Sequence, residues 1–199
     1  MRGVKPPNLN YFEIMCILIL KPKGVSMPDY TTLCRCAGHN PHGFGFALPG
    51  EKPFKTLNFD SFIDKVYSVD EALPMILHFR LATHGSIRPS NCHPFKDDSN
   101  GLMFAHNGVM HINTLPDKTD SETAFKLLFS PSSDKYGFGS KKFSQAVETI
   151  RGESRFGFMN DRGEIIAFGR FYDKTGNIIN GVNFKVKDKV LFSNQGFRY

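Results

Sequence analysis

Tryptophan is missing from this 199-residue chain, and cysteine is scarce, with four residues at positions 16, 34, 36 and 92. Four cysteines at such uneven spacing are too few for the disulfide framework of a secreted protein. Long hydrophobic runs are also missing, because no stretch approaches the ~20 apolar residues that cross a membrane. The first fifteen residues make a poor secretory signal, since Pro6, Pro7 and Glu13 interrupt the approach to the first apolar run. These absences favour a soluble protein in the reducing cytoplasm, with no membrane contact.

Strong charge of either sign is lacking too, since 25 Lys and Arg against 19 Asp and Glu give a net charge of +6 at pH 7. The excess is spread along the second half without a basic block, so it permits an anionic partner but does not favour nucleic-acid binding. Disorder is excluded by an apolar fraction of 40% that includes 20 Phe and 6 Tyr. Without repeats or a linker, the length predicts one domain with a substantial core.

Apolar patterning predicts strands that come in runs. Continuous or alternating apolar stretches predict strands at 15–20, 44–48, 75–81, 102–106, 182–186 and 190–192, and a hairpin that joins 155–160 to 164–170. Helical spacing predicts helices at 59–66, 119–128 and 143–150. Thr119 and Glu122 fit a capping box, and Ala124, Leu127 and Leu128 are expected to form the buried face of that helix. Because strands and helices do not alternate strictly, we expect an α+β sandwich rather than a doubly wound parallel sheet.

Cys16 is the first candidate for chemistry, although a cysteine in a strand is more often a small core residue. If Cys16 becomes the first residue, its α-amine has a pKa of about 7.7–8.0, so a useful fraction is neutral base at pH 7. The same residue then supplies both a nucleophile and a general base. If Met1–Met15 stays attached, that nitrogen is an amide and the base is lost.

Polar residues that follow predicted strands are the other candidates. Arg80 is followed by small residues that leave room for a ligand, and its guanidinium suits a carboxylate. Asn107-Gly108 reads either as a plain turn or as the two donors of an oxyanion hole. Asp120 either stabilises a helix start or binds a ligand ammonium group.

In this order and spacing the motifs resemble the class II glutamine amidotransferases, whose glutaminase domains use an N-terminal nucleophile. The matching stretches are MC at 15–16, HFRLATHG at 78–85, NCHPF at 91–95, AHNGVM at 105–110 and TDSE at 119–122. The resemblance covers nearly everything from Met15 onward. It implies a four-layer αββα sandwich of the N-terminal-nucleophile hydrolase type.

The resemblance also implies a reaction. Cys16 would be the thiol nucleophile, its own α-amine the base, and Asn107 and Gly108 the groups that stabilise the tetrahedral oxyanion. Glutamine would be hydrolysed through a γ-glutamyl thioester to glutamate and ammonia, with no metal and no other cofactor.

Further residues would hold the glutamine backbone, by the same resemblance. Arg80 would bind the α-carboxylate, with Thr83 and His84 lining that wall. Asp120 would bind the α-ammonium group, and His93 would support the site.

Departures from the family pattern leave several points open. Leu81 stands where the sugar-phosphate synthase relatives carry a tryptophan. Fourteen residues precede Met15, so residues 1–15 are expected to be a leader or arm and residues 16–199 the amidotransferase-like domain. Either Met15 is the true start, or the leader is removed, or the protein is inactive. No synthase domain follows, so ammonia would pass to a separate synthetase or ligase, or simply be released.

Two other functions and one metal site stay open. The same cysteine could hydrolyse another γ-glutamyl-type amide, which Leu81 motivates, or the chain could be a non-catalytic binding subunit that keeps its leader. Cys34 and Cys36 with His39 and His42 could bind zinc, but their spacings are tighter than those of zinc fingers. We therefore favour a loop with incidental cysteines over a metal site.

Overall fold

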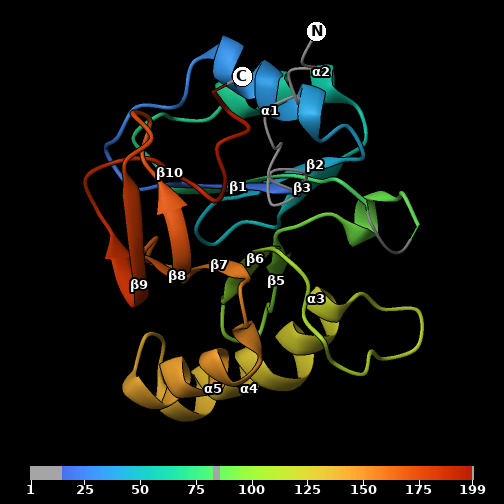
Figure 1. The fold of residues 1–199 in the computed structure, drawn as a ribbon, viewed down its shortest axis with the longest axis vertical. Helices are drawn as coiled ribbons and strands as arrows, with labels where there is room; N and C mark the ends of the chain where they lie inside the picture. Colours follow the sequence, from blue (N-terminus) through green and yellow to red (C-terminus); the bar gives the residue numbers. More distant parts are fainter. Residues whose placement is uncertain (1–14, 83–85, 199) are drawn as a thin grey trace, which may run out of the picture.

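The computed structural model describes residues 15–82 and 86–198, which form strands and short helices (Figure 1). The strands are β1 (Ile17–Lys21), β2 (Phe44–Ala47), β3 (Phe54–Thr56), β4 (Met75–Phe79), β5 (Phe95–Lys96), β6 (Met103–Asn107), β7 (Arg155–Met159), β8 (Ile165–Tyr172), β9 (Ile178–Val186) and β10 (Leu191–Phe192). The helical segments are α1 (Tyr30–His39), α2 (Phe59–Tyr67), the 3-10 turn η2 (Pro89–Asn91), α3 (Asp120–Ala124), the π-helical turn η3 (Phe125–Phe129), α4 (Ser130–Tyr136) and α5 (Lys141–Arg151). No helix in these ranges has the length and apolar character that a membrane crossing requires.

The described strands form one antiparallel sheet that curls back on itself. Their order is β3-β2-β4-β1-β10-β8-β7-β6-β5, and β9 pairs with β8 beside this path. The short strand β10 joins the two halves, because it pairs with β1 on one side and with β8 on the other. The sheet therefore brings β1 against strands from the second half of the chain.

The alternation of side chains along each strand builds separate cores on its two faces. In β1, Ile17 and Ile19 pack with residues of α1 and α2, whereas Leu18 and Leu20 face the other half of the sheet. Gly157 of β7 lies so close to β1 that an added Cβ would come 2.4 Å from Leu20 Cδ2. The two halves of the sheet are therefore packed face to face.

Three hydrophobic cores define four layers. One core lies between α1, α2 and the first half of the sheet, one lies between the two halves, and one lies between the second half and α3 to α5. Figure 1 shows this stacking, with α1 and α2 at one end of the molecule and α3 to α5 at the other. The α+β sandwich expected from the strand runs is confirmed, and so is the four-layer αββα arrangement that the resemblance implies.

Most predicted elements are present, with one correction and several omissions. The predicted hairpin is β7 and β8, and the capping box opens α3, where Thr119 Oγ1 accepts a hydrogen bond from the Glu122 N–H at 3.1 Å. The predicted buried face of that helix is wrong at Leu127, whose side chain is 62% exposed. The π-helical turn rotates the following residues, so Phe125 and Phe129 are buried instead. The helices α1 and α4 and the short strands β3 and β5 were not predicted.

Candidate active site

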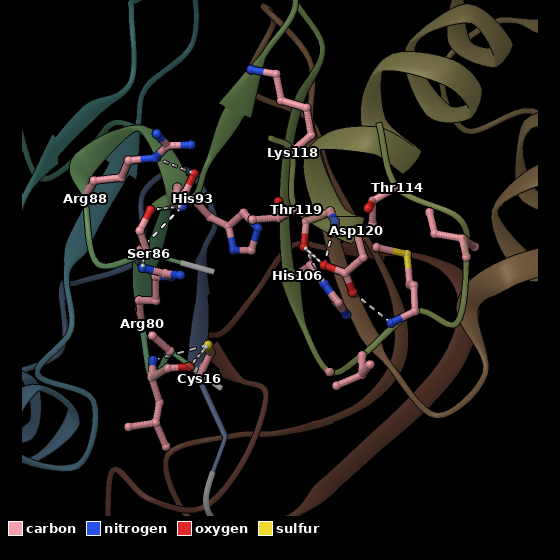
Figure 2. A pocket seen from close by; sticks show the side chains of 18 of the residues that line it. Cys16, Arg80, Ser86, Arg88, His93, His106, Thr114, Lys118, Thr119 and Asp120 are labelled. Atoms are coloured by element: carbon pink, nitrogen blue, oxygen red, sulfur yellow. Dashed lines mark hydrogen bonds between the residues drawn. The ribbon is translucent and has the colours of Figure 1, made fainter. Parts of the chain in front are cut away.

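A cavity of about 600 Å³ opens where both halves of the sheet present strand ends. Cys16 comes directly before β1 and Arg80 directly after β4, and the pairing of Ile17 with Phe79 places them opposite each other. Gly108 follows β6, and Asp120 opens α3. All four residues line the cavity. Figure 2 shows Cys16 and Arg80 on one side of it and Asp120 on the other.

Cys16 is held by the chain segment that follows β4. The Leu81 N–H donates to the Cys16 sulfur at 3.3 Å, and the sulfur lies 3.5 Å from the Leu81 carbonyl oxygen. Burial raises the pKa of the Cys16 thiol, and the Leu81 N–H and the charge of Arg80 oppose that rise only in part. The thiol is therefore protonated at neutral pH, and its activation needs a base.

The backbone around Cys16 is fixed from the far end of the chain. The Asn194 side-chain amide donates to the Cys16 carbonyl oxygen at 2.9 Å and to the Met15 carbonyl oxygen at 3.2 Å. Asn194 follows β10, the strand that pairs with β1. The sheet pairing thus positions the residue that anchors the thiol.

Arg80 is almost completely buried, with 5% of its surface exposed. Its Nη1 donates to the Ser86 carbonyl oxygen at 3.0 Å, and the Asn91 side-chain amide donates to the same oxygen at 3.0 Å. Asn91 Oδ1 also accepts a hydrogen bond from Arg88 Nε at 3.3 Å. These contacts hold two guanidinium groups along one wall of the cavity, a suitable arrangement for an anionic group.

In the Asn107-Gly108 turn, one residue lines the cavity and the other is buried in the interior. Gly108 lines the cavity and has φ +141°, whereas Asn107 is not among the described lining residues and is 1% exposed. Asn107 Nδ2 donates to Ser193 Oγ at 2.8 Å, and its Oδ1 has no hydrogen-bond partner among the described residues. In this geometry the Gly108 backbone is the nearer part of the expected oxyanion site.

Asp120 faces the cavity from the first turn of α3 (Figure 2). Its Oδ2 accepts a hydrogen bond from the Met110 N–H at 2.9 Å, and its Oδ1 accepts one from the Ser121 N–H at 2.6 Å. These bonds tie the carboxylate to the segment that follows Gly108. A carboxylate held in this way presents negative charge to a cation in the cavity.

His93 lines the cavity and belongs to a buried group with His78 and His106. Its Nδ1 is 3.0 Å from His78 Nε2, and burial lowers the pKa of His93 well below its ordinary value. A neutral, hydrogen-bonded ring fits the supporting position that the sequence predicts.

Two of the predicted site residues, Thr83 and His84, lie outside the described residues. The cavity brings together the other predicted side chains except that of Asn107. Sequence reasoning gave no role to four side chains that hold this site, namely those of Ser121, Ser154, Ser193 and Asn194. Three of these are serines, a residue type too common to stand out.

The alternative zinc loop has no counterpart in the described part of the chain. The loop that we expected around Cys34 and Cys36 is wrong, because both lie on helix α1, where Cys36 is buried against the first core. His42 Nδ1 accepts a hydrogen bond from the Ala82 N–H at 2.9 Å. Residues 15–82 and 86–198 contain no group of three or more His, Cys, Asp or Glu side chains placed to hold a metal ion.

Comparison with known proteins places these residues in a family context. The family model described as "Glutamine amidotransferases class-II" matches residues 34–165. A Saccharomyces cerevisiae protein named as a glutamine--fructose-6-phosphate aminotransferase [isomerizing] is 43% identical over 51 residues, which cover 23% of this chain and 20% of that protein. A second yeast protein, named as glutamine amidotransferase DUG3, is 35% identical over 82 residues, which cover 33% of this chain and 22% of that protein. The matches thus span only about a fifth of these relatives.

Solved structures share the fold over most of the described chain. Glutamine phosphoribosylpyrophosphate amidotransferase from B. subtilis, complexed with ADP and GMP, matches with a TM-score of 0.56 at 17% identity and covers 89% of this chain and 41% of its own. A structure described as the allosteric regulatory enzyme of purine biosynthesis gives a TM-score of 0.53 at 17% identity, over 90% of this chain and 41% of that one. At such identity the likeness concerns the fold alone.

Proposed function

The chain belongs to the class II glutamine amidotransferases, and from that premise we propose that residues 16–199 hydrolyse the side-chain amide of glutamine at Cys16. The observation that carries the proposal is that a thiol, a buried guanidinium, a glycine backbone and a carboxylate line one cavity. They come from positions 16, 80, 108 and 120, which only the fold brings together. Their charges are complementary to the zwitterionic head of an amino acid.

The two charged groups would orient the substrate. Arg80 binds the α-carboxylate, and Asp120 binds the α-ammonium group from the opposite wall. Thr83 and His84 are proposed to complete the wall beside Arg80. Holding both ends of the head group places the side-chain amide near Cys16, which lowers the entropic cost of the reaction.

The reaction then proceeds by nucleophilic substitution at the amide carbon. The α-amine of Cys16 takes the thiol proton, and the sulfur attacks the amide carbon to form a C–S bond. The Gly108 N–H, with the Asn107 amide if its side chain turns from Ser193, stabilises the oxyanion. The amine returns the proton to the leaving nitrogen, the C–N bond breaks, and ammonia departs. Water hydrolyses the thioester to give glutamate and the free thiol.

This mechanism requires that Cys16 be the first residue, so we propose that residues 1–15 are a leader that is removed, or that translation starts at Met15. A peptide-linked nitrogen at Cys16 cannot accept the proton. We further propose that the ammonia passes to a separate acceptor enzyme in the cytoplasm. No cofactor is needed for the steps above.

A glutaminase assay tests the proposal directly. Protein whose translation begins at Met15, with the methionine removed, is expected to release glutamate and ammonia from glutamine. Cys16→Ala in the same protein should reduce turnover to background while leaving the unfolding transition unchanged, because the cysteine contributes the nucleophile and little packing. Equal turnover in both proteins would exclude Cys16 as the nucleophile.

The intact mass of the natural protein decides between an enzyme and a binding subunit. A mass that lacks residues 1–15 supports the enzyme. A full-length mass, together with glutamine binding but no turnover, would favour a non-catalytic subunit.

A larger γ-glutamyl-type amide is a second candidate substrate. The cavity continues past Arg80 to Arg88 and Lys118, which supply positive charge beyond what the head group of glutamine needs. A γ-glutamyl peptide carries a second carboxylate that could reach these groups. Competition between glutamine and a γ-glutamyl dipeptide separates the two candidates, because efficient turnover of glutamine alone would rule out the larger amide.

A further inference from the structure

Three histidines are buried beside the cavity, namely His78, His93 and His106, with exposed fractions of 0%, 7% and 2%. His78 Nε2 lies 3.0 Å from His93 Nδ1 and 3.0 Å from the His106 carbonyl oxygen. Burial lowers the pKa of His78 to about 3 and that of His106 to about 4. Each ring is therefore neutral at pH 7 and carries one donor and one acceptor nitrogen.

His106 differs from the other two because its ring contacts two walls of the cavity. Its Nδ1 lies 2.8 Å from Ser121 Oγ, on α3 directly after Asp120. Its Nε2 lies 3.0 Å from Ser154 Oγ, just before β7. One imidazole thus connects the carboxylate side of the cavity to the side that carries the Gly108 turn.

Ser154 supports that turn from beneath. A Cβ added at Gly108 would come 2.3 Å from Ser154 Oγ, which shows how closely the two residues are packed. The Ser154 hydroxyl donates to the Val109 carbonyl oxygen at 3.2 Å. The position of the Gly108 N–H therefore depends on Ser154.

The contact between Ser154 and Val109 favours the tautomer of His106 that carries its proton on Nε2. When the Ser154 hydroxyl donates its hydrogen to Val109, it accepts from His106, so Nε2 is the donor. In the neutral ring Nδ1 is then the acceptor, and the Ser121 hydroxyl donates to it. With the proton on Nδ1 instead, the Ser121 hydroxyl would accept from the ring and donate to Asp120.

This assignment matters for Asp120, because the Ser121 hydroxyl has a second possible acceptor. Ser121 Oγ lies 3.1 Å from Asp120 Oδ1, but a hydroxyl has only one hydrogen to donate. While that hydrogen points at His106, Asp120 accepts only the backbone N–H groups of Ser121 and Met110 among the described residues. Lone pairs on the carboxylate then remain for a ligand in the cavity.

We propose that His106 is a positioning residue that turns the Ser121 hydroxyl away from Asp120 and holds Ser154 beneath the Gly108 turn. It keeps the carboxylate available to the α-ammonium group of the substrate and fixes the backbone donor of the oxyanion site. Both ring nitrogens are occupied by serines, so His106 does not itself exchange protons with the substrate. This role rests on the proposed function.

Binding of the reaction product tests, without any turnover, whether His106 keeps Asp120 available to the α-ammonium group. L-Glutamate has the α-ammonium group, and glutarate is the same dicarboxylate without it. In the full chain, His106→Gln lacks an acceptor at the Nδ1 position, so the Ser121 hydroxyl turns to Asp120. Glutamate is expected to bind about tenfold more weakly by calorimetry, which corresponds to one hydrogen bond to a charged group, while glutarate binding stays unchanged.

Two matched variants separate this role from a general loss of structure. His106→Asn keeps an oxygen near the Nδ1 position, so glutamate should bind within about threefold of the parent. In His106→Gln with Ser121→Ala, the competing hydroxyl is gone, and glutamate affinity should recover. His111→Gln, at an exposed histidine outside the cavity lining, controls for the loss of an imidazole.

Turnover by the protein that begins at Cys16 tests whether His106 holds Ser154 beneath the Gly108 turn. His106→Asn cannot donate to Ser154, so kcat is expected to fall about tenfold with little change in KM. His106→Gln should show the opposite pattern, because it keeps a donor near the Nε2 position and loses the acceptor.

Two results would overturn the role of His106. One is that the Gln and Asn variants weaken glutamate binding equally, and the other is that Ser121→Ala fails to restore it. If the parent binds glutamate in neither the full chain nor the form that begins at Cys16, the proposed function falls as well. Should the His106 variants fail to fold, Ser154→Ala removes only the contact between His106 and the Gly108 turn, and it must still lower kcat without raising KM.

Discussion

Glycine at position 108 illustrates how closely the site is packed at the level of a single residue. Its φ of +141° lies in a region that side chains rarely adopt, and its Cα faces Ser154. The sequence identified this glycine as a candidate oxyanion donor through the motif around it. The structure adds a steric reason, because no residue with a Cβ fits there.

Gly108→Ala is therefore expected to destabilise the fold and to lower activity. An added Cβ would come 2.8 Å from the Ser154 Cα as well as meeting the hydroxyl, so the backbone must move. The free energy of unfolding should fall by about 3 kcal/mol or more, the sum of backbone strain and overpacking. Denaturation in urea measures it.

Gly137→Ala is the matched control, because Gly137 also has a positive φ of +85° but nothing lies within 4 Å of its added Cβ. Its loss should be limited to the conformational term of about 1 kcal/mol. Equal losses at the two positions would show that contact with Ser154 is unimportant.

At the scale of elements, the loop between α1 and β2 holds the segment that contacts the thiol. The His42 N–H donates to the Arg80 carbonyl oxygen at 3.0 Å, and its ring accepts from the Ala82 N–H. Between these two bonds lies Leu81, whose N–H reaches Cys16. From the sequence, His42 was expected only as a ligand in the alternative zinc loop. No local pattern links it to Ala82, which lies forty residues further along the chain.

His42→Leu is expected to slow alkylation of Cys16. Without the acceptor for Ala82, the Leu81 N–H moves from the sulfur, and the thiolate loses a hydrogen bond. The rate with iodoacetamide at pH 8, measured at the Cys16 peptide by mass spectrometry, should fall about tenfold. His42→Asn keeps an acceptor near the Nδ1 position and should react at a rate close to that of the parent. Equal rates in all three proteins would contradict the role of the loop.

Helix α3 and the turn that follows show where local patterning fails. Spacing of three and four residues correctly located the helix and its cap but placed Leu127 in the core. The π-helical turn η3 has a longer period, so Phe125 and Phe129 take the buried positions against Phe104. Filling the third core with three aromatic rings outweighs the local preference for a regular helix.

At the scale of the whole molecule, the three buried histidines make the fold sensitive to acid. Their folded-state pKa values lie below the ordinary value of about 6.5, so the unfolded chain binds more protons. Their contribution to stability is therefore fully present above pH 6.5 and falls as the pH drops toward about 4 for His106 and about 3 for His78. The carboxyl groups of Asp97 and Glu122, whose pKa values are also lowered, lose their stabilisation only below about pH 4.5.

The free energy of unfolding should thus fall markedly between pH 7.5 and pH 5.0. His78 and His106 alone contribute about 2 kcal/mol each over this interval, since each pH unit below 6.5 adds about 1.4 kcal/mol per neutral buried histidine. Urea denaturation at the two pH values measures the difference. His111→Gln should show the same fall, whereas a flat profile in the parent would mean that the three rings become protonated without unfolding.

The sequence by itself determined the strand runs, most helices and the order of the chemical motifs. These are local properties, because apolar periodicity and capping depend on residues a few positions apart. The family resemblance added the roles of Cys16, Arg80 and Asp120, which remain proposals at the level of chemistry.

Only the tertiary structure decided which groups meet. The curled sheet places the ends of β1, β4 and β6 at one cavity. It lets Ser193 and Asn194, which follow β10, bind the backbone of Leu18 in β1 and of Cys16. It also shows Asn107 turned to Ser193, and His106 between two serines 33 positions apart in the sequence. Such contacts depend on how four layers pack, and no pattern within a short window of sequence contains that information.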